Sequence, residues 1–238
     1  MTTLLAFDTA TELLSIAVAA HGQVLSHEAA GGAQASAELI PAIRALLGRS
    51  GVTLAELDAI AFGRGPGAFT GLRTACSVAQ GLAFGVRKPV LPIDTLLAVA
   101  EDARAGRGTL RVWVTMDARM DEIYAAQYAC AGADGWRTLD PPRLTTPQWL
   151  NERWSAEPAE VIAGNAPAVF GERLSTGAAE LAPDALPRAV AMLPLAQAMW
   201  ARGEALDAAH ALPLYLRDKV AQTTEERDAA RAAKEALR

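Results

Sequence analysis

Hydrophobic and polar positions along this 238-residue chain follow two periodicities. Short, nearly continuous apolar runs bounded by glycine, proline or charged residues are typical of buried strands. Apolar positions spaced three and four residues apart are typical of one face of a helix. In the first 105 residues these patterns predict strands at 4–7, 15–19, 24–28, 57–62 and 89–93, and helices at 36–48, 72–84 and 95–105.

The order of these elements indicates a fold. Three strands that form an antiparallel meander, followed by helix, strand, helix, strand and helix, match a ribonuclease-H-like lobe. The pattern begins again after the glycine-containing stretch at 105–108, with strands predicted at 112–117 and 122–129. Asp117 lies 109 residues after Asp8, and aligning the two aspartates also aligns the apolar positions of the two predicted hairpins. This alignment favours a duplicated lobe.

We therefore predict an α/β protein of two ribonuclease-H-like lobes with mixed sheets, at residues 1–106 and 107–220. The second lobe is expected to be less regular, because proline-containing segments at 140–142 and 146–147 mark loops. Its other predicted elements are a helix at 148–154, a strand at 161–163 and a helix at 193–202.

A charged, alanine-rich tail follows at 221–238. Thr223 and Glu226 have the spacing of a helical capping box, but the apolar positions are almost all alanine, which makes a helix there marginal without a partner. We expect a solvated extension, with docking on another surface as the alternative.

Composition narrows the functional classes. The chain is 51% hydrophobic and 21% charged, as in folded globular proteins, and its formal net charge is −5. Because this charge does not attract phosphate backbones, a nucleic-acid substrate would be held mainly by a partner. Cys76 and Cys130 lie far apart and outside any Cys/His cluster, which argues against a disulfide framework or a zinc site.

The first residues do not have the pattern of a signal peptide, because four apolar residues lead directly to Asp8 and no basic region precedes them. No uncharged run approaches the length of about 20 residues that spans a bilayer. We expect a cytoplasmic protein without a membrane partner.

The glycine-rich stretch at 63–74 carries the most chemical information. It places four glycines and a proline between a predicted strand and a predicted helix. Free backbone N–H groups and the positive end of a helix dipole meet at such a turn, which suits an anion or a closely packed backbone. The stretch matches neither the Walker A pattern nor the usual dinucleotide pattern.

Four residues of this stretch are candidates for contact with an anion. Arg64 and Arg73 flank the loop, where they would hold a phosphate, pair with acidic groups of a partner, or simply be solvated. Gly65 and Gly67 would let a ligand approach the backbone, although glycines in such loops more often serve conformation than contact.

Four blocks of sequence, in this order along the chain, resemble one known family. They are LLAFDTAT at 4–11, the glycine-rich stretch at 63–73, VTMDARMDEIY at 114–124 and PLYLR at 213–217. On these residues, and over about 3–220, the chain is similar to the TsaB (YeaZ) family of the actin-like, ASKHA-type superfamily. The resemblance implies a bacterial cytoplasmic protein that is needed for threonylcarbamoylation of N6 of adenosine 37 in tRNAs reading ANN codons.

The resemblance also implies partners. In this family the protein is a scaffold and activator that pairs with the catalytic paralogue TsaD, while the ATPase TsaE joins the complex. It can pair with a second copy when alone, and tRNA is reached only through the complex.

The catalytic paralogue holds a metal with two histidines four residues apart, just after the strand that follows its glycine-loop helix. Thr95 and Val99 stand at these positions here, and neither replaces an imidazole. The chain's own histidines, His21, His27 and His210, have no second ligand at a suitable spacing. We therefore expect no catalytic residue and no metal site.

Asp8 and Asp117 leave two interpretations open. In actin-like ATPases, acidic residues at the ends of the first strands of both lobes organise Mg²⁺ through water, and these two match in position. Alternatively, each aspartate caps its own turn. We expect no intrinsic cofactor, and ATP or ADP with Mg²⁺ at most at a subunit interface. The candidate nucleotide or anion site comprises Asp8, Arg64, Gly65, Gly67, Arg73 and Asp117.

Two helices of the first lobe are candidates for a partner surface, because the family uses helices of this lobe to pack against TsaD. Both helices must first cover their own sheet, so burial within the lobe is the default for any one of these residues and a partner surface is the alternative. The candidate interface residues are Leu39, Ile43, Leu46, Leu72, Ala75 and Ala79.

Two hypotheses from other classes compete with a non-catalytic subunit. A stand-alone ATPase or kinase on the same fold would use Asp8 and Asp117 with Mg²⁺. A peptidase would hold a stoichiometric metal, which the replacement of histidine at Thr95 and Val99 argues against.

Overall fold

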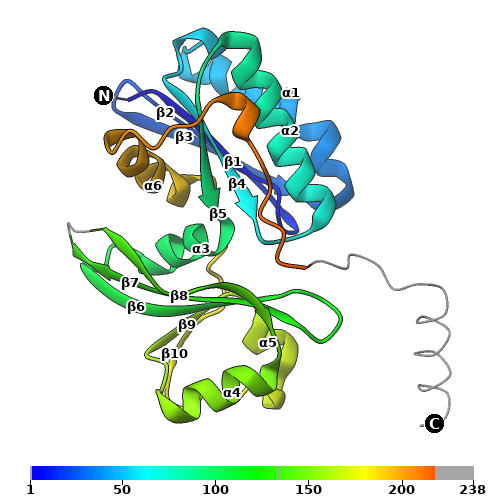
Figure 1. Ribbon diagram of the computed structural model, residues 1–238. Coiled ribbons are helices and arrows are strands. Elements are labelled where there is room, and N and C mark those ends of the chain that lie inside the picture. The colour runs from blue at the N-terminus through cyan, green and yellow to red at the C-terminus, as the bar shows by residue number, and fades with distance from the viewer. Residues whose placement is uncertain (1, 133–134, 218–238) are drawn as a thin grey trace, which may run out of the picture.

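Two five-stranded mixed sheets form the centres of two lobes in the computed structural model, which describes residues 2–132 and 135–217 (Figure 1). The first sheet has the order β3-β2-β1-β4-β5, in which β1 runs antiparallel to β2 and parallel to β4. Its strands are β1 (Leu4–Asp8), β2 (Leu13–Ala20), β3 (Gln23–Ala30), β4 (Ala59–Gly65) and β5 (Val90–Asp94).

The second sheet repeats the first. Its order is β8-β7-β6-β9-β10, and β6 again runs antiparallel to the strand after it and parallel to β9. The α/β class, the mixed sheets and the antiparallel opening meander are therefore confirmed. The strands are β6 (Thr109–Asp117), β7 (Ile123–Ala131), β8 (Trp136–Thr145), β9 (Val161–Ala163) and β10 (Glu180–Ala182).

Helices cover both faces of each sheet and separate the two sheets (Figure 1). α1 and α2 pack on the outer face of the first sheet, α3 and α6 lie between the sheets, and α4 and α5 cover the outer face of the second. Their bounds are α1 (Ala35–Ser50), α2 (Phe69–Val86), α3 (Thr95–Arg104), α4 (Pro147–Ala156), α5 (Ala166–Phe170) and α6 (Ala189–Ala201).

The C-terminal part of the chain returns to the first lobe. α6, which the sequence pattern assigns to the second lobe, packs on β1 and β2, and the 3-10 turn Ala208–His210 packs on α2. Leu206 forms an antiparallel bridge to Val90 at the edge of the first sheet. The predicted tail at 221–238 lies outside the described residues.

One loop predicted from prolines in the second lobe is wrong. The predicted loop at 140–142 lies within β8, which continues through Pro141 and Pro142. β8 is an edge strand, and its register with β7 shifts around Gln127 and Asp140, so a missing N–H is tolerated there. The short edge strand β10 carries no comparable sequence signal.

The glycine-rich stretch packs tightly against the β1–β2 turn. A Cβ added to Gly71 would overlap the carbonyl oxygen of Thr9, and one added to Gly63 would overlap the carboxylate of Asp8. The N–H of Ala68 donates to the carbonyl oxygen of Ala10 at 2.8 Å. Gly71 therefore serves the close approach of two backbones, and Gly63 leaves room for the Asp8 side chain.

A matched pair of glycine substitutions in α2 tests this packing. Gly71→Ala should lower the free energy of unfolding by about 1–3 kcal/mol because the new methyl group has no room. Gly81→Ala, with nothing within 4 Å of the added Cβ, should raise it by about 0.5–1 kcal/mol through helix propensity. Urea denaturation measures both, and equal effects of the two substitutions would contradict the proposed packing.

Candidate functional site

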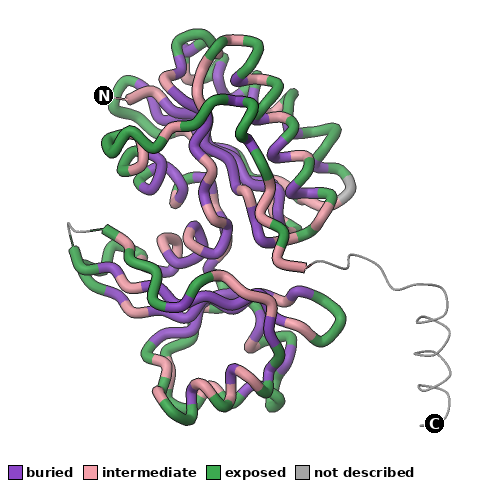
Figure 2. The backbone as a smooth tube through the Cα atoms, in the orientation of Figure 1, coloured by how far each residue is buried: buried purple, intermediate pink, exposed green. Residues whose placement is uncertain are grey.

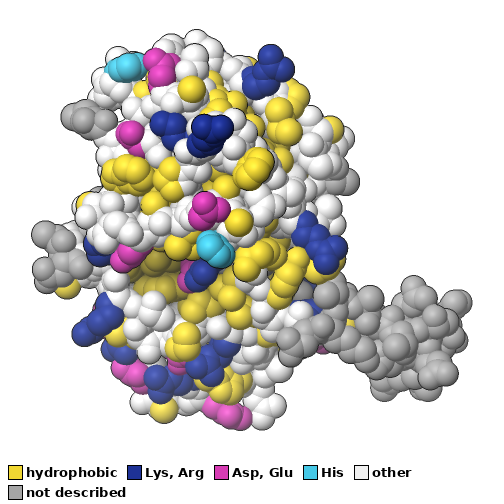
Figure 3. All heavy atoms as spheres, turned by 45° about the horizontal axis from the view of Figure 1, so that its top comes forward, with side chains coloured by type: hydrophobic (Ala, Val, Ile, Leu, Met, Phe, Trp, Pro, Cys, Tyr) yellow, Lys and Arg dark blue, Asp and Glu magenta, His cyan; other side chains and the backbone are white. Residues whose placement is uncertain are grey.

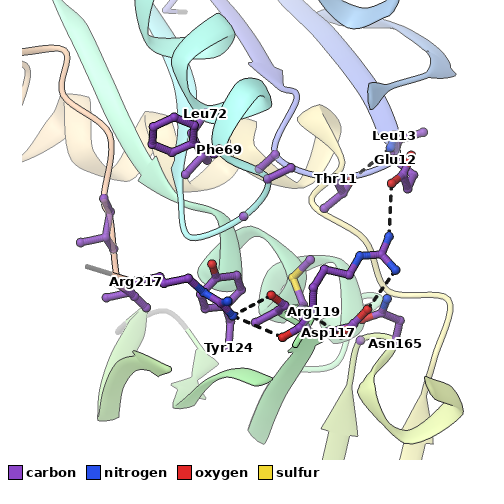
Figure 4. A pocket seen from close by; sticks show the side chains of 18 of the residues that line it. Thr11, Glu12, Leu13, Phe69, Leu72, Asp117, Arg119, Tyr124, Asn165 and Arg217 are labelled. Carbon is purple, nitrogen blue, oxygen red and sulfur yellow. Dashed lines mark hydrogen bonds and ion pairs between the residues drawn. The ribbon is translucent and has the colours of Figure 1, made fainter. Parts of the chain in front are cut away.

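A cavity of about 540 Å³ lies between the two lobes. The first lobe contributes the β1–β2 turn at 10–13 and the start of α2, and the second lobe contributes the end of β6 with the following turn at 116–120. The segment at 211–217, which we call the C-terminal strap, closes one side with its last four residues (Figure 4). Most of the wall is apolar, and Leu72, Met116 and Leu216 are typical of it.

Asp117 faces this cavity, but both oxygens of its carboxylate already have partners within the second lobe. One carboxylate oxygen accepts a hydrogen bond from the Arg119 N–H at 2.8 Å, and the other pairs with the Arg119 guanidinium at 3.3 Å. The Asp117 N–H donates to the Asn165 side chain at 2.9 Å. Arg119 also reaches across the cavity to Glu12, at 3.5 Å (Figure 4).

Asp8 lies behind the wall of the cavity and is completely buried. One carboxylate oxygen accepts from the Ala10 N–H at 2.6 Å, and the other accepts from the Thr95 hydroxyl at 2.9 Å. The same hydroxyl accepts from the Gly65 N–H at 3.2 Å. Burial raises the pKa of Asp8 to about 6, although the bonds from Ala10 and Thr95 lower it.

The two arginines that flank the glycine-rich stretch have partners within the chain. The Arg64 Nε donates to Asp94 at 2.5 Å. The Arg73 Nε donates to the Tyr215 hydroxyl at 3.1 Å, and its guanidinium lies 3.7 Å from the centre of the Phe69 ring. Cation–aromatic and hydrogen-bonding contacts thus place Arg73 against the C-terminal strap.

The six residues of the candidate nucleotide or anion site do not line one cavity, although Asp8 and Gly65 share the Thr95 hydroxyl. Gly67 and Asp117 line the cavity, whereas Asp8, Arg64, Gly65 and Arg73 do not. Gly65 has a φ of +111° and lies against the Leu214 carbonyl, where an added Cβ would be 2.9 Å from the oxygen. The expectation of one shared site is corrected because Asp8 and Arg64 are each engaged by partners within the chain, and the strap occupies the space beside Gly65.

These residues do not fit a magnesium-bound nucleotide. Asp8 is sealed from the cavity, and Asp117 is neutralised by Arg119. The side chains of Arg119 and Met120 also line the cavity beside Asp117. Among the described residues, no group of three His, Cys, Asp or Glu side chains is arranged to hold a metal ion.

Five of the six candidate interface residues lie in the core of the first lobe, and the sixth, Leu72, is buried in the wall of the cavity. Leu39, Ile43, Leu46, Leu72, Ala75 and Ala79 are at most 2% exposed. This corrects the sequence-based interpretation, because the apolar stripes of α1 and α2 face their own sheet. Other positions along the same two helices are exposed (Figure 2). The exposed residues include Ile40, Ser77, Gln80, Gly81 and Phe84.

None of the helices in the described ranges is long and apolar enough to cross a membrane.

Comparisons with known proteins give one consistent result. Residues 17–140 match the family model of TsaD, tRNA N6-adenosine threonylcarbamoyltransferase. The chain is 34% identical over 221 residues to the tRNA threonylcarbamoyladenosine biosynthesis protein TsaB of Escherichia coli K12, covering 92% of this chain and 96% of that protein. The protein of the same name from Haemophilus influenzae is 35% identical over 227 residues, covering 92% of this chain and 94% of that protein.

A solved structure agrees with these sequence matches. YeaZ from Pseudomonas aeruginosa superposes with a TM-score of 0.82 at 41% identity, over 91% of this chain and 100% of that chain. The two-lobe actin-like fold expected from the sequence is thereby confirmed.

The buried carboxyl of Asp8 predicts a pH dependence of stability. Its pKa of about 6 in the folded chain exceeds its usual 3.8, so the folded state binds the proton more tightly than the unfolded state. The resulting stabilisation is complete below pH 4 and is lost as the pH rises through 6, which should lower the free energy of unfolding by roughly 3 kcal/mol.

Denaturation at a series of pH values, with Asp8→Asn and a control, tests this prediction. Asp8→Asn removes the titrating group and should flatten the decline between pH 4 and 6, whereas the exposed Asp121→Asn should leave it intact. An unchanged decline in Asp8→Asn would contradict the assignment to Asp8.

Proposed function

The chain belongs to the TsaB (YeaZ) family, and we propose that it is the non-catalytic scaffold and activator subunit that pairs with a TsaD-like enzyme. In this role it takes part in the transfer of threonylcarbamoyl to N6 of adenosine 37 of tRNAs that read ANN codons. The observation that carries the proposal is the match to two proteins named for tRNA threonylcarbamoyladenosine biosynthesis over nearly their whole length.

The surroundings of Thr95 and Val99 support a role without catalysis. The resemblance places these residues where the TsaD family has its metal-binding histidines. Here the Thr95 hydroxyl donates to Asp8 and accepts from Gly65, so it links three elements of the first lobe. Val99 is completely buried in apolar surroundings. Thr95 therefore contributes hydrogen bonds to the interior of the protein, and Val99 contributes apolar packing.

The outward faces of α1 and α2 are the surface that we propose for the TsaD-like partner. Phe84 is 78% exposed, which is high for a large apolar side chain, and it follows Ser77 and Gly81 along one face of α2. Small residues beside an exposed aromatic ring allow another helix to approach closely and bury the ring. The same face would serve a second copy when the chain is alone.

The other components enter through the complex in this proposal. A TsaE-like ATPase joins the pair, and tRNA is reached only through the assembly. The net charge of −5 agrees with this, and on the face seen in Figure 3 the lysines and arginines are dispersed among acidic side chains. ATP or ADP with Mg²⁺ would belong at a subunit boundary, because the cavity of this chain does not suit it.

The stand-alone ATPase or kinase receives little support from the geometry. That hypothesis needs the carboxylates of Asp8 and Asp117 at one metal ion. Asp8 has no exposed surface, and Asp117 is paired with Arg119.

Reconstitution tests the proposed function. A TsaD-like protein and a TsaE-like ATPase, supplied with threonylcarbamoyl-AMP and unmodified tRNA, should form the modified adenosine only when this chain is added. Mass spectrometry of the digested tRNA measures the product. Equal product without this chain would contradict the scaffold role.

A pair of surface substitutions tests the proposed interface. Phe84→Glu should weaken binding to the TsaD-like protein by at least about tenfold, because a charge without a partner would be buried. Val169→Glu, at an exposed apolar position of α5 in the second lobe, is the matched control and should bind normally. Isothermal titration calorimetry measures both affinities. Equal affinities would place the interface elsewhere.

A further inference from the structure

The PLYLR block at 213–217, which belongs to the C-terminal strap, has no role in the proposed function. It nevertheless contacts the first lobe at several points. The Leu214 N–H donates to the Arg64 carbonyl at 2.7 Å. The Tyr215 hydroxyl accepts from Arg73, and its ring lies 5.4 Å from that of Phe69. The C-terminal strap is therefore held beside the glycine-rich stretch and the first turns of α2.

Arg217, the one charged residue of the strap, reaches the second lobe (Figure 4). Its Nη2 donates to the carbonyl oxygens of Ala118 at 2.9 Å and Arg119 at 3.3 Å, and it pairs with the Glu122 carboxylate at 2.7 Å. Its Nη1 lies 2.7 Å from the sulfur of Met120. The side chain is only 14% exposed, so these contacts are partly shielded from water.

The turn that Arg217 contacts has an unusual backbone. Arg119, Met120 and Asp121 have φ values of 63°, 55° and 61°, although none is glycine. Three consecutive side chains in the left-handed region cost conformational free energy that surrounding contacts must offset. A hydrogen bond from the Ala118 N–H to the Glu122 carbonyl, at 2.9 Å, closes this turn. The planar guanidinium then binds the carbonyls that the turn presents.

Other polar contacts across the mouth of the cavity are weak by comparison. The pair between Arg119 and Glu12 spans 3.5 Å, and its side chains are 75% and 85% exposed. Exposed pairs of this kind add little to stability and are screened by salt. Arg217 combines a carboxylate partner, two carbonyl partners and low exposure, so it is the stronger connection.

We infer that the C-terminal strap is an interlobe latch, in which Arg217 holds the second lobe at a fixed separation from the first. The latch bridges the lobes from within the chain, where no bound ligand is needed to do so. Both the strap and the turn line the cavity, so release of Arg217 would also open that wall. Since the strap is fastened to α2, the latch would connect the proposed docking helix to the second lobe, a consequence that rests on the proposed function.

Distances between spin labels on the two lobes test the latch in the isolated chain. Ser36→Cys at the start of α1 and Ser155→Cys in α4 are exposed positions, and the native Cys76 and Cys130 are buried. Pulsed electron paramagnetic resonance, with labelled protein diluted into unlabelled protein, should give a single narrow distance distribution for the parent. Arg217→Gln should shift this distribution to longer distances and broaden it, because the lobes lose the polar contact beside the cavity and stay joined through the packing of α3 and α6.

Two further variants keep the test decisive if Arg217→Gln does not fold. Tyr215→Ala releases the strap at its other end and should produce the same shift. Arg217→Lys keeps the charge beside Glu122 but cannot span two carbonyls, so it should give an intermediate shift. Circular dichroism and thermal unfolding establish that each variant is folded.

Arg173→Gln is the matched control. Arg173 pairs with Asp121 of the same turn at 3.0 Å, but it belongs to the second lobe and does not bridge the lobes. Its removal should leave the distribution unchanged. A parent-like distribution in folded Arg217→Gln and Tyr215→Ala would overturn the latch, as would an equal shift in Arg173→Gln. The measurement needs no partner, so its outcome is independent of the proposed function.

Discussion

The buried carboxylate of Asp8 is the constraint on which the first lobe depends. A carboxylate without water is costly to bury, so each of its oxygens requires a donor. Ala10 supplies one from the β1–β2 turn, and Thr95 supplies the other from the start of α3. Thr95 in turn accepts from Gly65 of β4, and Gly63 leaves room for the carboxylate itself. One side chain thus sets the positions of the turn, the glycine-rich stretch and the first interlobe helix.

Asp117, the residue of the second lobe that corresponds to Asp8, has different surroundings. Asp117 ends β6 as Asp8 ends β1, and the two sheets share one strand order. Asp117 nevertheless faces the cavity and is satisfied by Arg119 of its own turn. A repeated fold therefore places two carboxylates at equivalent strand ends in different surroundings, because the neighbours of each end differ.

The chain returns to the first lobe after the second lobe is complete, which strengthens the packing beneath the surface of the first lobe. α6 and the C-terminal strap pack on the first sheet and on α2 after the second lobe is complete. The core beneath α1 and α2 is filled by apolar side chains with almost no exposure, which leaves their outward faces free for a partner. The strap then carries Arg217 across to the turn of the second lobe.

The sequence by itself determined the elements of the first lobe, the repeat of the opening hairpin and the family, because periodicity and glycine spacing are local properties of the chain. The strands and helices of the first lobe follow from apolar spacing, and the four blocks identify the family without any contact being known. Tertiary structure alone decided which groups each charged residue meets. Arg73 bonds to Tyr215, 142 residues away, and Arg217 bonds to Ala118 across 99 residues. It also decided that Pro141 and Pro142 lie in an edge strand, since an edge position depends on which strands pair. Such partners are brought together by packing of the whole chain, and no local pattern encodes them.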